Sequence, residues 1–153
     1  MLKALVRGVV AGIAGTGAMT AYQLAVGHLQ GKSGETPVPR SWAEAPAPAQ
    51  VAKKAADLVG QGTRLTRADV PWLTDAVHWL TGVGWGVLYG TARAPVGGLA
   101  FGSAVWGASY AELVPLGIYR PPWKYPAHEL ALDLSYHLVY GMTVAGAYAA
   151  LDR

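Results

Sequence analysis

The sequence predicts an all-α polytopic membrane protein in which four transmembrane helices form one bundle. Hydrophobic residues make up 52% of the 153 residues and charged residues 14%, whereas a soluble domain carries roughly 25% charged residues. The charges concentrate in 30–74 and 117–127, which leaves long apolar stretches elsewhere. Those stretches suit transmembrane helices, which need about 20 apolar residues each. The chain length is that of a single domain.

The four predicted spans follow one another with one long interruption. We expect them at 4–29, 72–92, 96–118 and 128–151. Lys3 and Arg7 precede the first span in the manner of a signal peptide. That span is longer than a typical signal-peptide core, so we interpret it as an uncleaved helix. A short turn at 93–95 makes the second and third spans antiparallel neighbours.

The long interruption, 30–71, is a polar connection between the first two spans. Prolines and small polar residues predict an irregular first part. Near 50–61, Val51, Ala55 and Leu58 recur at helical spacing, opposite charged residues. This pattern predicts a short amphipathic helix. It lies either in the membrane interface or against the ends of the bundle, and the sequence leaves both open.

Small residues recur at four-residue steps on one face of several spans, which marks the faces where membrane helices approach closely. The glycines that we assign to helix packing are Gly8, Gly12, Gly82, Gly86, Gly90 and Gly141. In the third span the series is Ala100, Ala104 and Ala108. Such glycine-zipper faces also allow a homo-oligomer.

The spans also resemble one another. A shift of 90 residues superposes the first span on the third, and a shift of 59 superposes the second on the fourth. The matched pairs include Gly8 with Gly98, Gly12 with Gly102, His78 with His137, and Gly82 with Gly141. We therefore expect two repeated helical hairpins of the same orientation, related by an axis along the membrane normal.

Ionisable residues continue these small-residue faces toward the leaflet that bears the polar connections. Such groups are costly at membrane depth and normally face the protein interior, which predicts one buried cluster near that leaflet. Its candidate ion or metal ligands are His78, Glu112, Glu129, Asp133 and His137, with Tyr22, Asp75, Tyr136 and Tyr140 around them. Imidazole and carboxylate suit divalent zinc, iron or manganese. We expect His137 to lie within hydrogen-bonding or ligand-bridging reach of His78 or Glu112.

Three functions are compatible with this cluster. The first is binding or passage of a proton or small cation, since histidine titrates near neutral pH. The second is a structural or assembly module whose polar residues only lock helix packing. The third is a membrane-embedded metal-dependent enzyme. We predict no catalytic residue, because Ser135 and His137 face different directions on a helix and no nucleophile elbow is present.

Composition limits the kinds of partner that the chain is expected to bind. The absence of cysteine excludes thiolate metal sites. The sequence has no basic run with interleaved aromatic residues, so we do not expect nucleic-acid binding. The expected partner is the lipid bilayer. Eight lysines and arginines lie on the side of the two polar connections and four on the other side. This count predicts that both termini lie outside, although Lys3 and Arg7 favour the opposite orientation.

The segment from Pro115 through Gly117 to Trp123, followed by His128-Glu129 and then by Asp133 and His137 at four-residue steps, resembles the YagU-like family of small bacterial inner-membrane proteins. The resemblance is best over 115–141 and extends back to His78 and Tyr89. It implies an integral protein of the bacterial inner membrane, without an assigned reaction. The chain departs from the family pattern, which favours Glu where Asp133 stands and has further acidic and histidine residues beside Glu112.

Overall fold

The computed structural model describes residues 1–31, 38–92 and 96–153. Within these ranges the chain is helical and contains no strand, which confirms the all-α prediction. The α-helices are α1 (Leu2–Leu29), α2 (Ala47–Leu58), α3 (Val70–Thr91), α4 (Gly98–Leu113) and α5 (Ala127–Leu151). Single 3₁₀ turns occupy Trp42–Glu44, Gly62–Arg64, Arg67–Asp69 and Pro122–Lys124. The expected turn at 93–95 lies outside the described residues.

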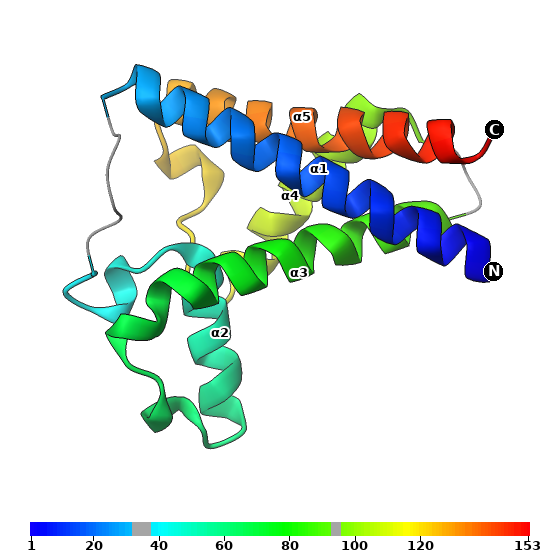
Figure 1. Ribbon diagram of the computed structural model, residues 1–153. Coiled ribbons are helices and arrows are strands. Elements are labelled where there is room, and N and C mark those ends of the chain that lie inside the picture. The colour runs from blue at the N-terminus through cyan, green and yellow to red at the C-terminus, as the bar shows by residue number, and fades with distance from the viewer. Residues whose placement is uncertain (32–37, 93–95) are drawn as a thin grey trace.

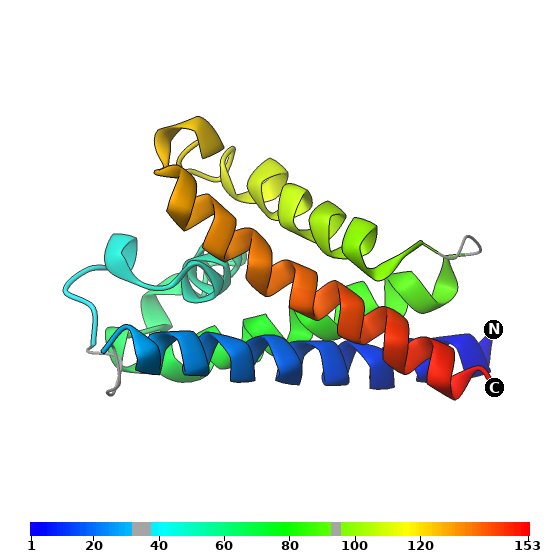
Figure 2. The same ribbon diagram turned by 90° about the horizontal axis from the view of Figure 1, so that it is seen from above.

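The four long helices form two antiparallel pairs, α1 with α3 and α4 with α5 (Figure 1). The pairs join where α5 packs along α1, whereas the backbones of α3 and α4 stay apart and are bridged by side chains, with Trp85 and Tyr89 of α3 packed on Phe101 of α4. Figure 2 shows the pairs close together at the end that holds both termini. They diverge toward the end that holds the two long connections.

The α1–α3 pair is a backbone-to-backbone contact made by glycine. A Cβ atom added at Gly8 would lie 2.7 Å from the Gly86 carbonyl oxygen, and one added at Gly12 would lie 2.9 Å from that of Gly82. A Cβ at Gly90 would lie 2.6 Å from the Ala4 carbonyl oxygen. Real side chains do not fit at such distances, so only glycine lets the two helices approach this closely. These faces are occupied within one chain, so a homo-oligomer, still a prediction, needs other surfaces.

The α4–α5 pair repeats that contact. Gly141 meets the backbone of Gly98 and Gly102 in the way that Gly86 meets Gly8 and Gly12. The pairing of Gly86 with Gly141 is a shift of 55 residues (141 − 86) between α3 and α5. The sequence comparison expected a shift of 59, because it matched the two histidines rather than the two contact glycines.

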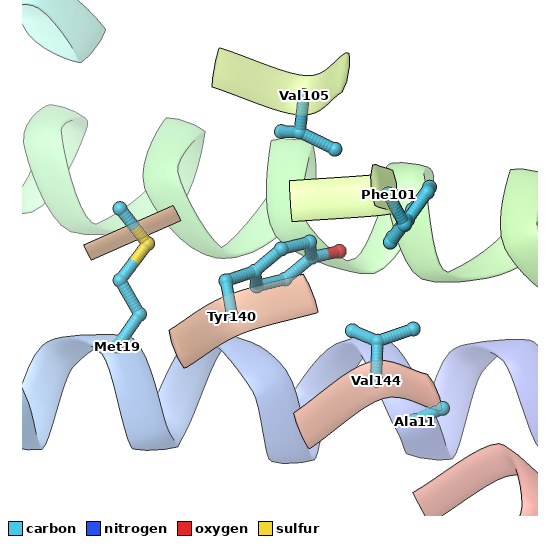
Figure 3. Close-up of a cluster of buried hydrophobic side chains, with 6 residues drawn as sticks. All are labelled: Ala11, Met19, Phe101, Val105, Tyr140 and Val144. Carbon is cyan, nitrogen blue, oxygen red and sulfur yellow. The ribbon is translucent and has the colours of Figure 1, made fainter. Parts of the chain in front are cut away.

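The core between the pairs is small, and its buried residues are Ala11, Met19, Phe101, Val105, Tyr140 and Val144 (Figure 3). Val144 and Tyr140 of α5 reach α1 at Gly15, where an added Cβ would lie 3.0 Å from the Tyr140 ring. Phe101 of α4 packs against Tyr140, with 6.1 Å between ring centroids. Large side chains thus fill the centre while glycines set the helix spacing.

One predicted boundary is wrong because α4 ends earlier than expected. Pro115 has no amide hydrogen to donate, so the regular helical hydrogen bonds stop at Val114, which itself keeps helical backbone angles and donates to the Tyr110 carbonyl. Gly117, at φ +67°, then turns the chain so that the amides of Ile118 and Tyr119 donate to the Leu113 carbonyl at 3.0 and 3.1 Å. The turn directs Tyr119 back toward the bundle.

Helix α2 crosses the direction of α3 (Figure 1) and packs on its first turn. Ala49 is buried in a second small core with Val70 and Leu73. The outer side of the α2 region is apolar and uncovered, with Leu58 88% and Val59 69% exposed. The amphipathic helix expected near 50–61 is therefore present, and it begins earlier because Pro48 is favourable in a first helical turn.

Membrane-crossing potential differs among the helices. Of the helices that the structure describes, α1 (Leu2–Leu29) alone is long and apolar enough by length and composition to cross a membrane, a property that it shares with signal sequences and with some soluble core helices. Helix α4, with 16 residues, is roughly 24 Å long. The structure thus confirms an all-helical chain, and of the four expected spans it leaves α1 as the one candidate among the described helices.

Candidate functional site

A cleft of about 290 Å³ lies between α3 and α4, in the seam that the two helix pairs leave open. Helices α1 and α5 contribute its inner wall, and the first turn of α2 contributes one end. Its lining residues are Thr16, Met19, Gln23, Ala47, Pro48, Val51, Val77, His78, Thr81, Gly82, Trp85, Val105, Ser109, Glu112, Leu113, Tyr119, Asp133, His137 and Tyr140. The volume is near the lower limit for small-molecule sites, about 300 Å³.

The polar side chains lie toward one end of the cleft. In α3, His78 is nearer the connection end than Trp85, and in α5, Asp133 is nearer that end than Tyr140. The order in α4 is the same, because that helix runs toward the connections and Glu112 is in its last turn. The ionisable side chains of the cleft therefore lie at the connection end, among apolar neighbours such as Val77 and Leu113, whereas the middle of the bundle contributes none of them.

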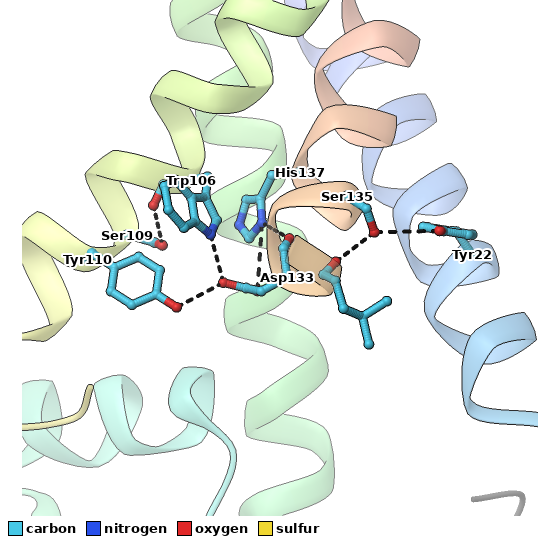
Figure 4. A network of polar contacts seen from close by, with 8 residues as sticks. Tyr22, Trp106, Ser109, Tyr110, Asp133, Ser135 and His137 are labelled. Carbon is cyan, nitrogen blue, oxygen red and sulfur yellow. Dashed lines mark hydrogen bonds and ion pairs between the residues drawn. The ribbon is translucent and has the colours of Figure 1, made fainter. Parts of the chain in front are cut away.

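Asp133 is the polar group of the cleft with the most hydrogen-bonding contacts (Figure 4). Its carboxylate accepts hydrogen bonds from the indole of Trp106 at 2.9 Å and the hydroxyl of Tyr110 at 3.2 Å. The His137 Nδ1 atom lies 2.9 Å from the Asp133 carbonyl oxygen. Since a carbonyl oxygen only accepts, Nδ1 carries the hydrogen, and Nε2 is the free nitrogen of the neutral ring.

His78 has its own partner. Its Nε2 atom lies 3.2 Å from the Thr20 hydroxyl of α1. The contact matches the Tyr110–Asp133 contact of the other helix pair, since Thr20 and Tyr110 are 90 residues apart and His78 and Asp133 are 55 apart. These are the shifts that also align the glycine contacts.

The hypothesis of a buried His/carboxylate cluster is wrong. Among the described residues, no group of three or more histidine or acidic side chains is placed to hold a metal ion. The structure gives His137 no hydrogen bond to His78 or Glu112, and its nearest acidic contact is the Asp133 carboxylate, 3.8 Å from Nδ1. Cation or proton handling by such a cluster and a metal-dependent enzyme are therefore not supported. The structural-module hypothesis required the same residues to pair with one another, but Asp133 bonds to Trp106 and Tyr110 and His78 to Thr20. The contact within the set that the structure describes is the one between His137 and Asp133 of the same helix.

The prediction that Glu112 faces the bundle interior is wrong, because it rested on the alanine face of α4 being the packed face. The alanine series that ends at Glu112 includes Ala100 and Ala104, and all three residues are exposed. Gly98 and Gly102, which lie on a neighbouring face of α4, contact α5 instead. Glycine allows a closer backbone approach than alanine, so the glycine face packs and Glu112 remains at the mouth of the cleft.

The other candidate residues lie apart from the cleft centre. Glu129 and Asp75 are exposed at the connection end. Tyr22 and Tyr136 pack edge to face at 5.5 Å between α1 and α5. Tyr140 lines the cleft, and its hydroxyl donates to the Gly82 carbonyl at 2.6 Å.

Sequence reasoning missed three residues that shape the cleft: Trp85, Ser109 and Tyr119. Tyr119 belongs to an aromatic and basic segment that the pattern linked only to lipid headgroups. Burial, reinforced by Asp133 and Tyr125, raises the pKa of Tyr119 to about 12. The Tyr119 phenol is therefore neutral at neutral pH and offers a ring face and a hydroxyl rather than a charge.

Comparison with known proteins adds no relative: no protein-family model, curated protein or solved structure matches the chain.

Proposed function

We propose that this chain is a membrane-embedded helical protein whose cleft between α3 and α4 binds a small amphipathic molecule. The observation that carries the proposal is the polarity of the cleft. The ionisable side chains His78, Glu112 and Asp133 gather at the connection end, and Trp85, Val105 and the ring of Tyr140 line the inner end. Ligand sites of this type are mostly apolar, with a few polar groups that fix orientation.

The surface supports a membrane environment. Large apolar side chains point outward on several helices, including Leu24 at 70%, Leu80 at 73% and Leu99 at 57% exposure. Apolar side chains on the outside of several helices suit contact with lipid chains. The connection end carries Trp123 and Lys124, a composition typical of the headgroup layer. The resemblance to the YagU-like family favours the bacterial inner membrane, and both the family and that location stay predictions.

We infer further that the fold consists of two repeated hairpins. The support is the shared contact of Gly86 and Gly141 with their partner helices. In a symmetric pair of hairpins, the α1–α5 contact would recur between α4 and α3. Gly15 allows the first contact, and the matching position in α4, 90 residues later, is Val105, whose larger side chain helps to keep the second seam open. Membrane proteins built from repeats commonly bind their substrates at the repeat interface.

A photolabelling experiment tests the cleft. The purified chain, held in a non-ionic amphipol, is titrated with a decyl maltoside that carries a diazirine at the end of its chain. Saturable labelling is expected near Trp85 and Val105, with non-saturable labelling of outward residues such as Leu80. Ser109→Trp should fill the cleft and remove the saturable labelling. Ser103→Trp is the matched control, because Ser103 lies on the same helix but is exposed and outside the cleft.

Two results would overturn the proposal. One is labelling that never saturates and spreads evenly over the outward-facing residues. The other is saturable labelling that Ser109→Trp and Ser103→Trp change equally. Circular dichroism of both variants shows whether each has kept its helices, so a loss of labelling through misfolding is recognised.

A further inference from the structure

A second pocket, of about 210 Å³, adjoins the polar end of the cleft. It is lined by three tyrosines, two carboxylates and a leucine: Tyr110, Tyr119, Tyr125, Glu129, Asp133 and Leu130. Tyr119 and Asp133 also line the cleft, so the two cavities share one wall. A molecule that occupied both would place one end among the tyrosines and the other beside Trp85.

The three tyrosines are held as one group. The Tyr110 ring lies 5.2 Å from that of Tyr119 and 6.1 Å from that of Tyr125, centroid to centroid. The Tyr125 hydroxyl accepts a hydrogen bond from the Arg120 amide at 3.1 Å. The turn at Gly117 fixes the approach of Tyr119. Their mutual packing and these backbone contacts orient the rings before any ligand binds.

The chemistry of this pocket suits a cation with an apolar surface. Aromatic faces attract cations, and tyrosine-rich cages are a known solution for alkylammonium groups. The Arg120 guanidinium already covers a face of the Tyr125 ring, with its carbon 4.8 Å from the centroid, so Tyr110 and Tyr119 are the rings left for a ligand cation. Asp133 is oriented by Trp106 and Tyr110, and the exposed Glu129 adds a second carboxylate at the rim.

We propose that the amphipathic molecule carries an alkylammonium head, which binds in the pocket of Tyr110, Tyr119 and Tyr125 while its chain enters the cleft. The inference rests on the proposed function and specifies its ligand. The pocket lies at the connection end and the cleft leads toward the middle of the bundle. From Asp133 to Tyr140, α5 advances roughly 10 Å, which allows a chain of moderate length. Head and chain thus follow the polarity of a bilayer leaflet.

The test uses three photoactivatable decyl probes that differ only in the head: trimethylammonium, maltoside and sulfate. Saturable labelling of the cleft is measured in the non-ionic amphipol, so that surface charge does not concentrate one probe. For each probe, the half-saturating concentration of a variant is divided by that of the wild type, which cancels differences in partitioning. The trimethylammonium probe is expected to saturate at the lowest concentration.

Substitutions then distinguish the contribution of the Tyr119 ring to binding from that of its hydroxyl. Tyr119→Leu should raise the half-saturating concentration of the trimethylammonium probe about tenfold, whereas Tyr119→Phe keeps the ring and should stay near the wild type. Glu129→Gln should raise it about two- to fivefold, as expected for an exposed charge. Glu129→Gln, which lies outside the cleft lining, should leave the maltoside probe unchanged, and this also shows that the cleft is folded. Because Tyr119 lines both the pocket and the cleft, its substitution is judged by comparing heads: Tyr119→Leu should raise the half-saturating concentration of the trimethylammonium probe more than that of the maltoside probe. Tyr22→Leu, which removes a tyrosine outside both pockets, is the matched control.

The outcomes distinguish the two proposals. Suppose that the maltoside probe labels the cleft saturably, but that Tyr119→Leu changes the labelling by all three probes equally or by none. The proposal of an alkylammonium head is then wrong, and the proposal that the cleft binds an amphipathic molecule is retained. A preference for the sulfate probe would also overturn the alkylammonium head. If no probe labels the cleft saturably, the proposed function itself fails.

Discussion

The Tyr140 hydroxyl donates a 2.6 Å hydrogen bond to the Gly82 carbonyl oxygen, and this bond ties α5 to α3 although the two helices have little other contact. The Tyr148 hydroxyl makes the same kind of bond to Gly90, at 3.0 Å. A glycine carbonyl in a helix has a second lone pair and no side chain to shield it. The glycine face of α3 therefore packs against α1 and also accepts hydrogen bonds from α5.

Removal of the Tyr140 hydroxyl should weaken this junction. Tyr140→Phe keeps the ring in the core but loses the bond, and we expect a loss of about 1 kcal/mol in the free energy of unfolding. Tyr89→Phe is the control, because the Tyr89 hydroxyl donates at an exposed site to Val96 and should matter less. Thermal unfolding of both variants in detergent, followed by circular dichroism, measures the difference. Equal midpoints would contradict the role assigned to the bond.

Two glycines of α3 should respond to alanine in opposite directions. A Cβ added at Gly86 would lie 2.5 Å from the Gly8 carbonyl oxygen, whereas one at Gly84 meets no atom within 4 Å. Gly86→Ala should therefore cost about 1–3 kcal/mol through overpacking. Gly84→Ala should stabilise the helix by about 0.5–1 kcal/mol, because alanine loses less backbone entropy. Unfolding midpoints that moved in the same direction would argue against the α1–α3 contact.

The start of α3 should make stability depend on pH. The Asp69 carboxylate accepts from the Thr66 amide at 2.7 Å and from the Trp72 indole at 3.2 Å. The Thr66 amide bond is the main reason that the pKa of Asp69 is lowered. The folded pKa is thus below the unfolded value of about 3.9, so this stabilisation is present above that value and is lost as pH falls through the folded pKa.

Asp69→Ala should consequently lower the unfolding temperature at pH 7, and the difference from the wild type should shrink below about pH 4. Asp75→Ala is the control, because Asp75 is exposed and has no hydrogen-bond partner among the described residues. A difference for Asp69→Ala that persisted unchanged at low pH would show that its carboxylate charge is not responsible.

Cysteine labelling can test membrane crossing, since the chain has no native cysteine. Thr63, in the 3₁₀ turn between α2 and α3, and Ala150, in the last turn of α5, are both exposed. In sealed vesicles, an impermeant maleimide should reach Thr63→Cys from the cytoplasmic side and Ala150→Cys from the other side. Both residues reacting from one side would contradict a membrane-spanning bundle, and the reverse assignment would contradict only the predicted orientation.

The helices and the packed face of α3 were predictable from the sequence because both depend on local periodicity. The apolar stretches predicted where long helices run, and the spacing of Gly82, Gly86 and Gly90 picked out the face that meets α1. In α4, the Gly98–Gly102 and Ala100–Ala104 series have the same spacing, so periodicity alone was unable to choose between them. Closer backbone contact at glycine decided the choice, and Glu112 moved to the mouth of the cleft as a result.

The candidate site was decided by tertiary structure alone. The sequence identified His78, Asp133 and His137 as polar residues within apolar stretches, but the partners of His78 and Asp133 come from other helices. The cleft exists because one seam between the pairs closes and the other does not, and this depends on Gly15 facing Tyr140 and Val144 while Val105 occupies the matching position. Such a difference in side-chain volume acts only once two helices are placed against each other, so no pattern within a single helix contains it.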